Sequence, residues 1–263
     1  MRPLTKTGNY ISTRIGRAIQ DYKLIEDKDR ILVGVSGGKD SLTLLRLLAD
    51  RRAWAPVKYD LVAIHVESDY ARALSSNTSS RQSSRTPSRG DEKSIKKSLK
   101  KFCKDNNIEY VLENISIEDQ RREVNCFWCS WNRRKALFLA ADKLGCNKVA
   151  LGHHKDDIIE TLLLNLFYQG EFSAMNPRQE LFGGKIVIIR PLCYVEEKYT
   201  RKFAKETRLP FAACNCPNAD LSKRRMVKKL IAKLEEDCPY IKTNLFKSMG
   251  RISREYLQIH DRE

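Results

Sequence analysis

The stretch from Ile31 to Ser41 constrains the fold of this chain more than any other part of the sequence. Ile31 to Val35 is a short apolar run rich in β-branched residues, which predicts a buried parallel strand. Gly37 and Gly38 then break the run, because glycine accepts backbone angles that other residues resist. From Ser41 the apolar residues recur at helical spacing. The stretch therefore predicts a strand, a tight turn and a helix in direct succession.

This succession gathers backbone N–H groups around one point at the positive end of the helix, an arrangement that suits phosphate. The order Ser-Gly-Gly-Lys-Asp-Ser adds a mobile lysine charge and two hydroxyl donors, and it differs from the Walker pattern. An ordinary turn between a strand and a helix is the alternative. The residues that we expect to hold phosphate groups are Ser36, Gly37, Gly38, Lys39, Asp40 and Ser41.

Strand-like and helix-like segments alternate along most of the chain. Apolar runs predict further strands at residues 61–66, 110–112, 148–151 and 185–189, and helical periodicity marks residues 9–24, 92–106, 127–144 and 156–168. Such alternation is typical of a doubly wound parallel α/β sheet. From about residue 222 the pattern predicts helices only. We expect an N-terminal helical segment (1–28), an α/β domain (29–215) and a basic helical region (216–263).

Composition sets the class of protein. In the 263 residues, 41% are hydrophobic, which is enough for a core, and no apolar run is long enough to span a bilayer. The N-terminus lacks the apolar core of a signal peptide, so we expect a soluble, cytoplasmic protein. The net charge of +16 predicts a polyanionic partner, most often nucleic acid, with a solvated basic surface as the alternative.

A Ser/Arg-rich insertion interrupts the alternating pattern at residues 71–91. Residues 75–90 contain no apolar side chain, so burial cannot offset the entropy of ordering them, and a mobile loop is expected. This loop is either an arm for RNA phosphates or a tolerated surface insertion.

The eight cysteines indicate metal binding or thiol chemistry, since structural disulfides are rare in the cytosol. Cys126-Phe-Trp-Cys129 opens a predicted helix, where thiolates are favoured, and Cys214 or Cys216 provides a third thiol. Three thiolates can hold a metal or a cluster with one coordination position open. A buried thiol pair and a redox disulfide are the alternatives. The other four cysteines are expected in the core or on the surface: Cys103, Cys146, Cys193 and Cys238.

A second polar turn, Gly152-His-His-Lys-Asp-Asp157, follows the strand predicted at residues 148–151. We expect it at the same sheet edge as the phosphate turn, because both turns follow parallel strands. Asp156 and Asp157 can hold Mg²⁺ or contact reacting groups, or can simply complement the helix dipole. His153 and His154 are adjacent and point apart on a helix or strand, so a metal site made by them is not expected.

These motifs together resemble the tRNA 2-thiocytidine synthetase family, PP-loop sulfurtransferases that thiolate cytidine 32 of the anticodon loop. The resemblance also includes Pro210-Phe-Ala-Ala-Cys214-Asn, residues 161–168 and residues 188–192, and extends from roughly residue 9 to 250. Each motif is shared more widely, but their order is specific. The resemblance implies the PP-loop ATP pyrophosphatase fold, similar to adenine nucleotide alpha hydrolases, with helices at both ends.

The family also implies a chemistry. Cys126, Cys129 and Cys214 would hold three irons of a 4Fe-4S cluster, and ATP would lie on residues 36–41 with Gly152 and His153, assisted by Mg²⁺. The C2 oxygen of cytidine would be adenylated, and sulfur carried on the open iron would attack C2. The candidate catalytic residues are Lys39, Asp40, Asp156 and Arg133. tRNA would be the substrate, a cysteine desulfurase the sulfur source, and the protein a homodimer.

The third cluster ligand is open between two cysteines. The family often has Cys-x-x-Cys where this chain has Cys214-Asn-Cys216, so Cys216 is an alternative third ligand.

Three other classes of protein also stay open. The 2-thiouridine synthetases share the mechanism but add zinc-binding Cys/His sets at both ends, which this sequence lacks. tRNA lysidine synthetase has a similar PP-loop without a cysteine trio. A non-enzymatic ATP-dependent RNA-binding module with a structural zinc is the third alternative.

Overall fold

The computed structural model describes residues 3–68, 89–116, 126–209, 223–253 and 255. The chain divides into two compact units. Unit 1 comprises Met1–His154 with Asn176–Asn218, and unit 2 comprises Lys155–Met175 with Ala219–Glu263. The domain boundaries expected at residues 28 and 215 stay predictions, and the Ser/Arg-rich stretch 75–90 lies almost entirely outside the described residues.

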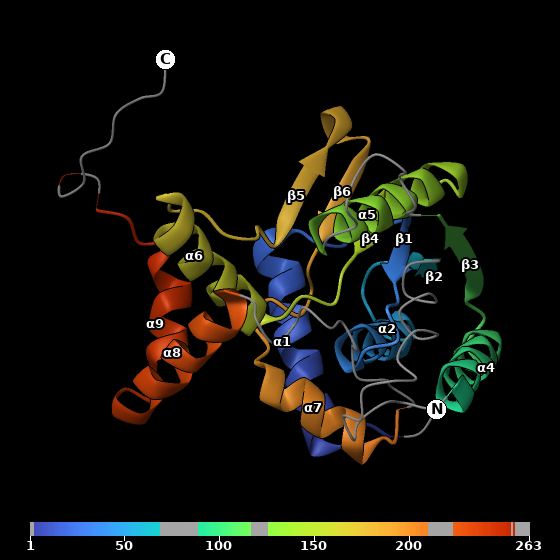
Figure 1. Cartoon of the computed structure of the whole chain (residues 1–263). Helices are drawn as coiled ribbons and strands as arrows, with labels where there is room; N and C mark the ends of the chain where they lie inside the picture. The colour runs from blue at the N-terminus through green and yellow to red at the C-terminus, as the bar shows by residue number, and fades with distance from the viewer. Residues whose placement is uncertain (1–2, 69–88, 117–125, 210–222, 254, 256–263) are drawn as a thin grey trace. The chain divides into compact units, whose positions relative to one another are not determined.

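Unit 1 is built on a six-stranded sheet with the strand order β3-β2-β1-β4-β6-β5 (Figure 1). The strands are β1 (Asp29–Gly34), β2 (Tyr59–Ser68), β3 (Glu109–Ile115), β4 (Lys148–Ala150), β5 (Arg178–Leu181) and β6 (Ile186–Ile189). All neighbouring pairs are parallel except β5 and β6. The parallel core confirms the predicted α/β fold. The antiparallel edge strand β5 was not predicted, because Arg-Gln-Glu-Leu carries no apolar run.

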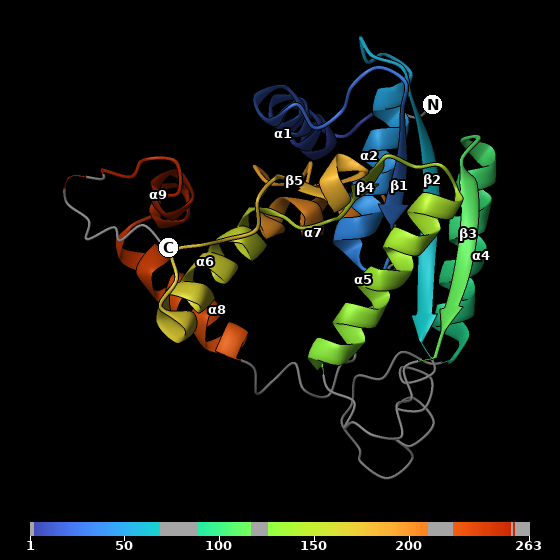
Figure 2. The ribbon, with the colours of Figure 1, turned by 90° about the horizontal axis from the view of Figure 1, so that it is seen from above.

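Helices cover the sheet of unit 1 on both faces. The helices of unit 1 are α1 (Lys6–Tyr22), α2 (Lys39–Arg52), α4 (Arg89–Asp105), α5 (Cys126–Lys143) and α7 (Glu197–Glu206), of which α1 and α7 pack against α2 and against each other. Helix α5 lies along one face, where Ala140 and Ala141 share a core with Leu32, Val62 and Ile64 (Figure 2). Helix α2 packs against β1 and β2, and α4 packs against β3. This arrangement is the doubly wound one that the sequence predicted.

The strand order creates a switch point between β1 and β4. From β1 the chain continues to β2 on one side of the sheet, whereas from β4 it continues toward β6 on the other side. In open α/β sheets a crevice forms outside the carboxyl ends of the strands at such a point. The segments that follow β1 and β4 are therefore brought together here.

Unit 2 consists of helices α6 (Lys155–Gln169), α8 (Lys223–Asp237) and α9 (Ile241–Ser248). Ile159 and Leu163 of α6 pack against Val227 and Ile231 of α8. The helices expected after residue 222 are thus confirmed. In the described residues, every helix is too short or too polar to cross a bilayer.

Candidate active site

The turn after β1 has the backbone geometry expected of a phosphate cradle. Gly37 has a φ of +81°, which favours glycine, and Gly38 is the N-cap residue of α2. Gly38 offers no side-chain hydrogen bond to the first turn of α2, so the positive end of this helix has no side-chain cap. The Ser41 hydroxyl lies 3.2 Å from the Ser36 nitrogen and donates to the Gly38 carbonyl at 3.0 Å. The two serines therefore hold the shape of the turn.

The turn after β4 meets this cradle directly. A Cβ atom at Gly152 would lie only 2.9 Å from the Ser41 nitrogen and 3.0 Å from its Cα. These are backbone atoms, so the contact cannot be relieved by moving a side chain. The two motifs share one sheet edge as the sequence predicted, and glycine at residue 152 permits their approach. An uncapped helix end beside two glycine turns fits the phosphates of a nucleotide.

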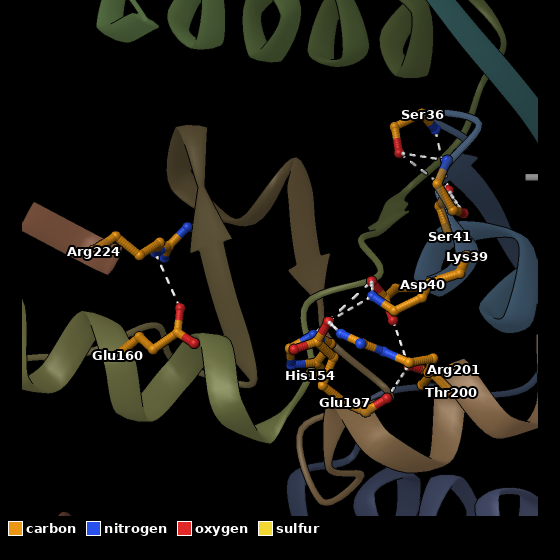
Figure 3. A network of polar contacts seen from close by, with 11 residues as sticks. Ser36, Lys39, Asp40, Ser41, His154, Glu160, Glu197, Thr200, Arg201 and Arg224 are labelled. Atoms are coloured by element: carbon orange, nitrogen blue, oxygen red, sulfur yellow. Dashed lines mark hydrogen bonds and ion pairs between the residues drawn. The ribbon is translucent and has the colours of Figure 1, made fainter. Parts of the chain in front are cut away.

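Lys39 is held at the cradle by two carboxylates (Figure 3). Its Nζ lies 2.8 Å from Oδ2 of Asp40 and 2.9 Å from Oε1 of Glu197 on α7. Burial lowers the pKa of Lys39, but the hydrogen bonds and charges of Asp40 and Glu197 outweigh burial and raise it above its ordinary value. Lys39 is therefore a fixed positive charge at neutral pH.

Asp40 is also oriented by contacts with side chains that lie far from it in the sequence. Thr200 of α7 donates a hydrogen bond to its Oδ1, and Nε2 of the buried His154 lies 3.9 Å from its Oδ2. Sequence reasoning selected His153, which is half-buried, and did not select Glu197, Thr200 or His154 as site residues. The amphipathic pattern of residues 197–206 was the available signal for α7, but nothing in it indicates contact with the phosphate turn.

Asp156 and Arg133, the other candidate catalytic residues, belong to different units. Asp156 is buried in the first turn of α6, and its Oδ1 lies 3.2 Å from Nζ of Lys242. Burial lowers the pKa of Lys242, but Glu235 and Asp156 outweigh burial and raise it. Arg133 lies on α5 in unit 1, and its buried Nε has no hydrogen-bond partner among the described residues. The catalytic roles of both residues stay proposals.

Cys126 and Cys129 occupy the first turn of α5. Their spacing of three residues places them on one face of this helix. Their side chains, and both Cys214 and Cys216, lie outside the described part of the structure. Among the described residues, no group of three His, Cys, Asp or Glu side chains could hold a metal. The thiol pair fits an iron–sulfur cluster in chemistry. The third ligand expected from the sequence, Cys214 or Cys216, lies outside the described residues.

Three of the remaining cysteines are core residues, as expected. Cys103, Cys146 and Cys193 are buried, and Cys238 is half-buried. Burial raises the pKa of Cys103 to about 11 and that of Cys193 to about 12. These thiols stay protonated at neutral pH, so they behave as small apolar side chains.

The strand, Ser-Gly-Gly-Lys-Asp-Ser turn and helix at the switch point of a parallel sheet define the PP-loop class of protein. A family profile described as a PP-loop domain matches residues 9–234. In fold, the chain is similar to the U34-tRNA thiolase NcsA from Methanococcus maripaludis, solved with its 4Fe-4S cluster. The TM-score is 0.69 at 20% identity, covering 96% of this chain and 80% of that one.

Curated relatives narrow the class. The tRNA-cytidine(32) 2-sulfurtransferase of Geobacter sulfurreducens is 41% identical, and that of Geobacter metallireducens is 40% identical. Each match covers 94% of this chain and 91% of the relative. The chain therefore belongs to the tRNA-cytidine(32) 2-sulfurtransferase family of PP-loop proteins.

Proposed function

We propose that this protein, a tRNA sulfurtransferase by family, uses ATP to convert cytidine 32 of tRNA to 2-thiocytidine. The observation that carries the proposal is the meeting of Gly152 with Ser41 at the switch point, beside the uncapped start of α2. This arrangement suits a phosphate group. It lies at the edge of the sheet where the parallel strand β3, which precedes α5, also ends. The relatives act on cytidine 32, and their similarity along the chain supports the same target here.

ATP activates the base in this proposal. The C2 oxygen of cytidine attacks the α-phosphorus, a C2–O–P bond forms, and pyrophosphate leaves with its charge held by Lys39 and the N–H groups of α2. Sulfur then attacks C2 and expels AMP, a far better leaving group than oxide. One donor that stabilises such developing charge contributes about 2.7–4 kcal/mol in comparable sites.

Mg²⁺ is expected to accompany ATP, since it normally bridges phosphates and one or two carboxylates. Asp156 is the candidate that the sequence offered for this role. Its Oδ1 is paired with Lys242 in unit 2, so metal ligation by this oxygen would compete with the ion pair.

A 4Fe-4S cluster would be held by Cys126, Cys129 and Cys214, with Cys216 as the alternative third ligand. When bound, the cluster would supply the sulfur for the transfer to C2. The chain's own contribution is to place two of these thiols at the start of α5, where the positive helix end favours thiolates. A cysteine desulfurase donor, a homodimeric state and a cytoplasmic location stay predictions.

Iron and acid-labile sulfide content of the anaerobically purified protein tests the cluster. We expect about four irons and four sulfides per chain in the wild type and a large decrease in Cys126→Ala. Cys238→Ala is the matched control, because Cys238 is a free, half-buried thiol that we did not select as a cluster ligand, so its replacement should leave both contents unchanged. Stoichiometric zinc in place of iron would favour a binding module and contradict the proposal.

A further inference from the structure

A buried arginine stands at the carboxyl end of β6 without a compensating charge. Arg190 follows Ile189 directly and is only 6% exposed. One of its terminal nitrogens donates to the Asn176 carbonyl, and its Nε is buried with no hydrogen-bond partner. Buried charges are normally paired, because removing an ion from water is costly. The described residues provide no such pairing for Arg190.

Two more guanidinium groups belong to the same region of unit 1. Helix α5, which carries Arg133 and Arg134, packs against β6. Burial and, to a smaller extent, the positive charge of Arg134 lower the pKa of Arg190 to about 10. The buried Nε of Arg133 also lacks a partner. Within the described part of the chain, none of these three arginines forms an ion pair, and the like charges of Arg134 and Arg190 oppose folding.

The position of Arg190 connects this charge to the nucleotide site. Ala150 of β4 pairs with Ile189 of β6, and the Leu151 nitrogen donates to the Ile189 carbonyl at 3.0 Å. Arg190 therefore follows β6 at the same sheet edge where Gly152 follows β4 and meets the phosphate turn. The two strands are neighbours in the sheet.

We propose that Arg190 and Arg134 form an anion subsite that binds a phosphate group of one of the two substrates. The planar guanidinium donors suit phosphate oxygens and bind them in pairs, and a bound phosphate would neutralise the two like charges. The identity of these substrates rests on the proposed function, and the source of the phosphate is either ATP or the tRNA backbone. Arg133 neighbours Arg134 on α5, and its buried Nε has no hydrogen-bond partner among the described residues.

Direct binding measurements test the subsite without requiring any thiolation. We would measure affinities for ATP and for tRNA with wild type, Arg134→Gln, Arg190→Lys and the control Lys185→Gln. Lys185 precedes the amino end of β6 and is 65% exposed, so the control removes one charge at the opposite end of the same strand. Arg134 is exposed, so its replacement does not threaten folding.

If the phosphate belongs to ATP, both variants should weaken ATP binding about tenfold or more and leave tRNA binding near the control. If it belongs to tRNA, both variants should weaken tRNA binding. Only Arg134→Gln, which removes a charge, should also reduce the magnitude of the slope of log affinity against log salt, by about 0.7–0.9. Affinities equal to the control for both substrates would overturn the subsite. A wild type that binds both substrates but never thiolates tRNA would instead contradict the proposed function. The binding affinities of the variants would still test the subsite in that case.

Inorganic phosphate gives an independent readout. Millimolar phosphate should raise the melting temperature of the wild type more than that of Arg134→Gln, because the ligand relieves the repulsion that the variant already lacks. The variant should also melt at a higher temperature than the wild type when no anion is present. If phosphate raised the melting temperature of both proteins equally, the result would contradict the subsite.

Discussion

Lys39 lies between two carboxylates, and this contact couples the phosphate turn to α7. Its side chain is 17% exposed and that of Glu197 is 15% exposed, so the pair is screened only in part by water. A nucleotide phosphate that binds Lys39 competes with Glu197 for the ammonium group. The pair stabilises the protein without ligand, and in the proposed function we expect it to loosen when ATP binds.

Glu197→Gln should therefore lower the free energy of unfolding of the ligand-free protein by about 1.5–3 kcal/mol, the usual contribution of a hydrogen bond to a charged group. The same change should tighten ATP binding, because a competitor for Lys39 is weakened. Urea titration and calorimetric ATP binding measure the two effects. The control is Glu180→Gln, whose partner Arg178 lies on the edge strand β5. ATP binding weakened as far as in Lys39→Ala would show that Glu197 positions the lysine instead.

Individual residues were predictable where the chemistry is local. Ser36, Lys39 and Ser41 follow from one short motif, and the structure brings them together with Gly152. Glu197 and Thr200 were not predictable in the same way. Thr200 contacts Asp40 across 160 residues of sequence, and no local spacing encodes a contact made by folding.

At the scale of elements, the close approach of two turns is the feature on which the site depends. Gly152 has no room for a Cβ because the backbone of Ser41 occupies the space. The strands before each turn are fully buried at this point, with Val33 and Ala150 paired across β1 and β4. Neither turn can move away from the other without shifting the buried strand that precedes it.

Gly152→Ala should push the two turns apart, lower stability by about 1–3 kcal/mol and weaken ATP binding strongly. Gly250→Ala is the matched control, since a Cβ there would meet only the Lys247 carbonyl at 3.9 Å. Thermal unfolding and ATP affinity of both variants measure the effect. An alanine at residue 152 that leaves ATP affinity intact would mean that the close approach does not shape the cradle.

The predicted strands of the parallel core are confirmed because each is carried by its own apolar run. Strand β5 and helix α7 were not predicted, because each is stabilised mainly by contacts with neighbouring elements. β5 has four residues and exists through its pairing with β6, aided by Gly183 and Gly184 with φ of +67° and +90° in the connection. Helix α7 is short, and only Thr200, Phe203 and Ala204 are buried.

At the scale of the whole molecule, the net charge of +16 requires a polyanionic partner or a well-solvated surface. Helix α4 presents four exposed lysines at helical spacing, Lys97, Lys100, Lys101 and Lys104, on the face opposite the buried Leu99 and Cys103. We expect these lysines to bind tRNA phosphates if the protein acts on tRNA as proposed.

Replacing Lys97, Lys101 and Lys104 by glutamine should weaken tRNA binding and lower the magnitude of its salt slope by about 0.7–0.9 for each phosphate that the variant no longer neutralises. A triple variant of Lys23, Lys28 and Lys58 removes the same charge from exposed positions near the amino end of the sheet. Filter binding over a range of salt concentrations compares the two. Equal weakening in both variants would show that only total charge matters.

The most direct test of the central claim is mass spectrometry of nucleosides from tRNA incubated anaerobically with cluster-loaded protein, ATP and a sulfide source. We predict 2-thiocytidine with the wild type and with Lys185→Gln. Lys39→Ala should form none while still binding tRNA. Thiolated uridine, or no thiolated base despite a full cluster and bound ATP, would contradict the assignment.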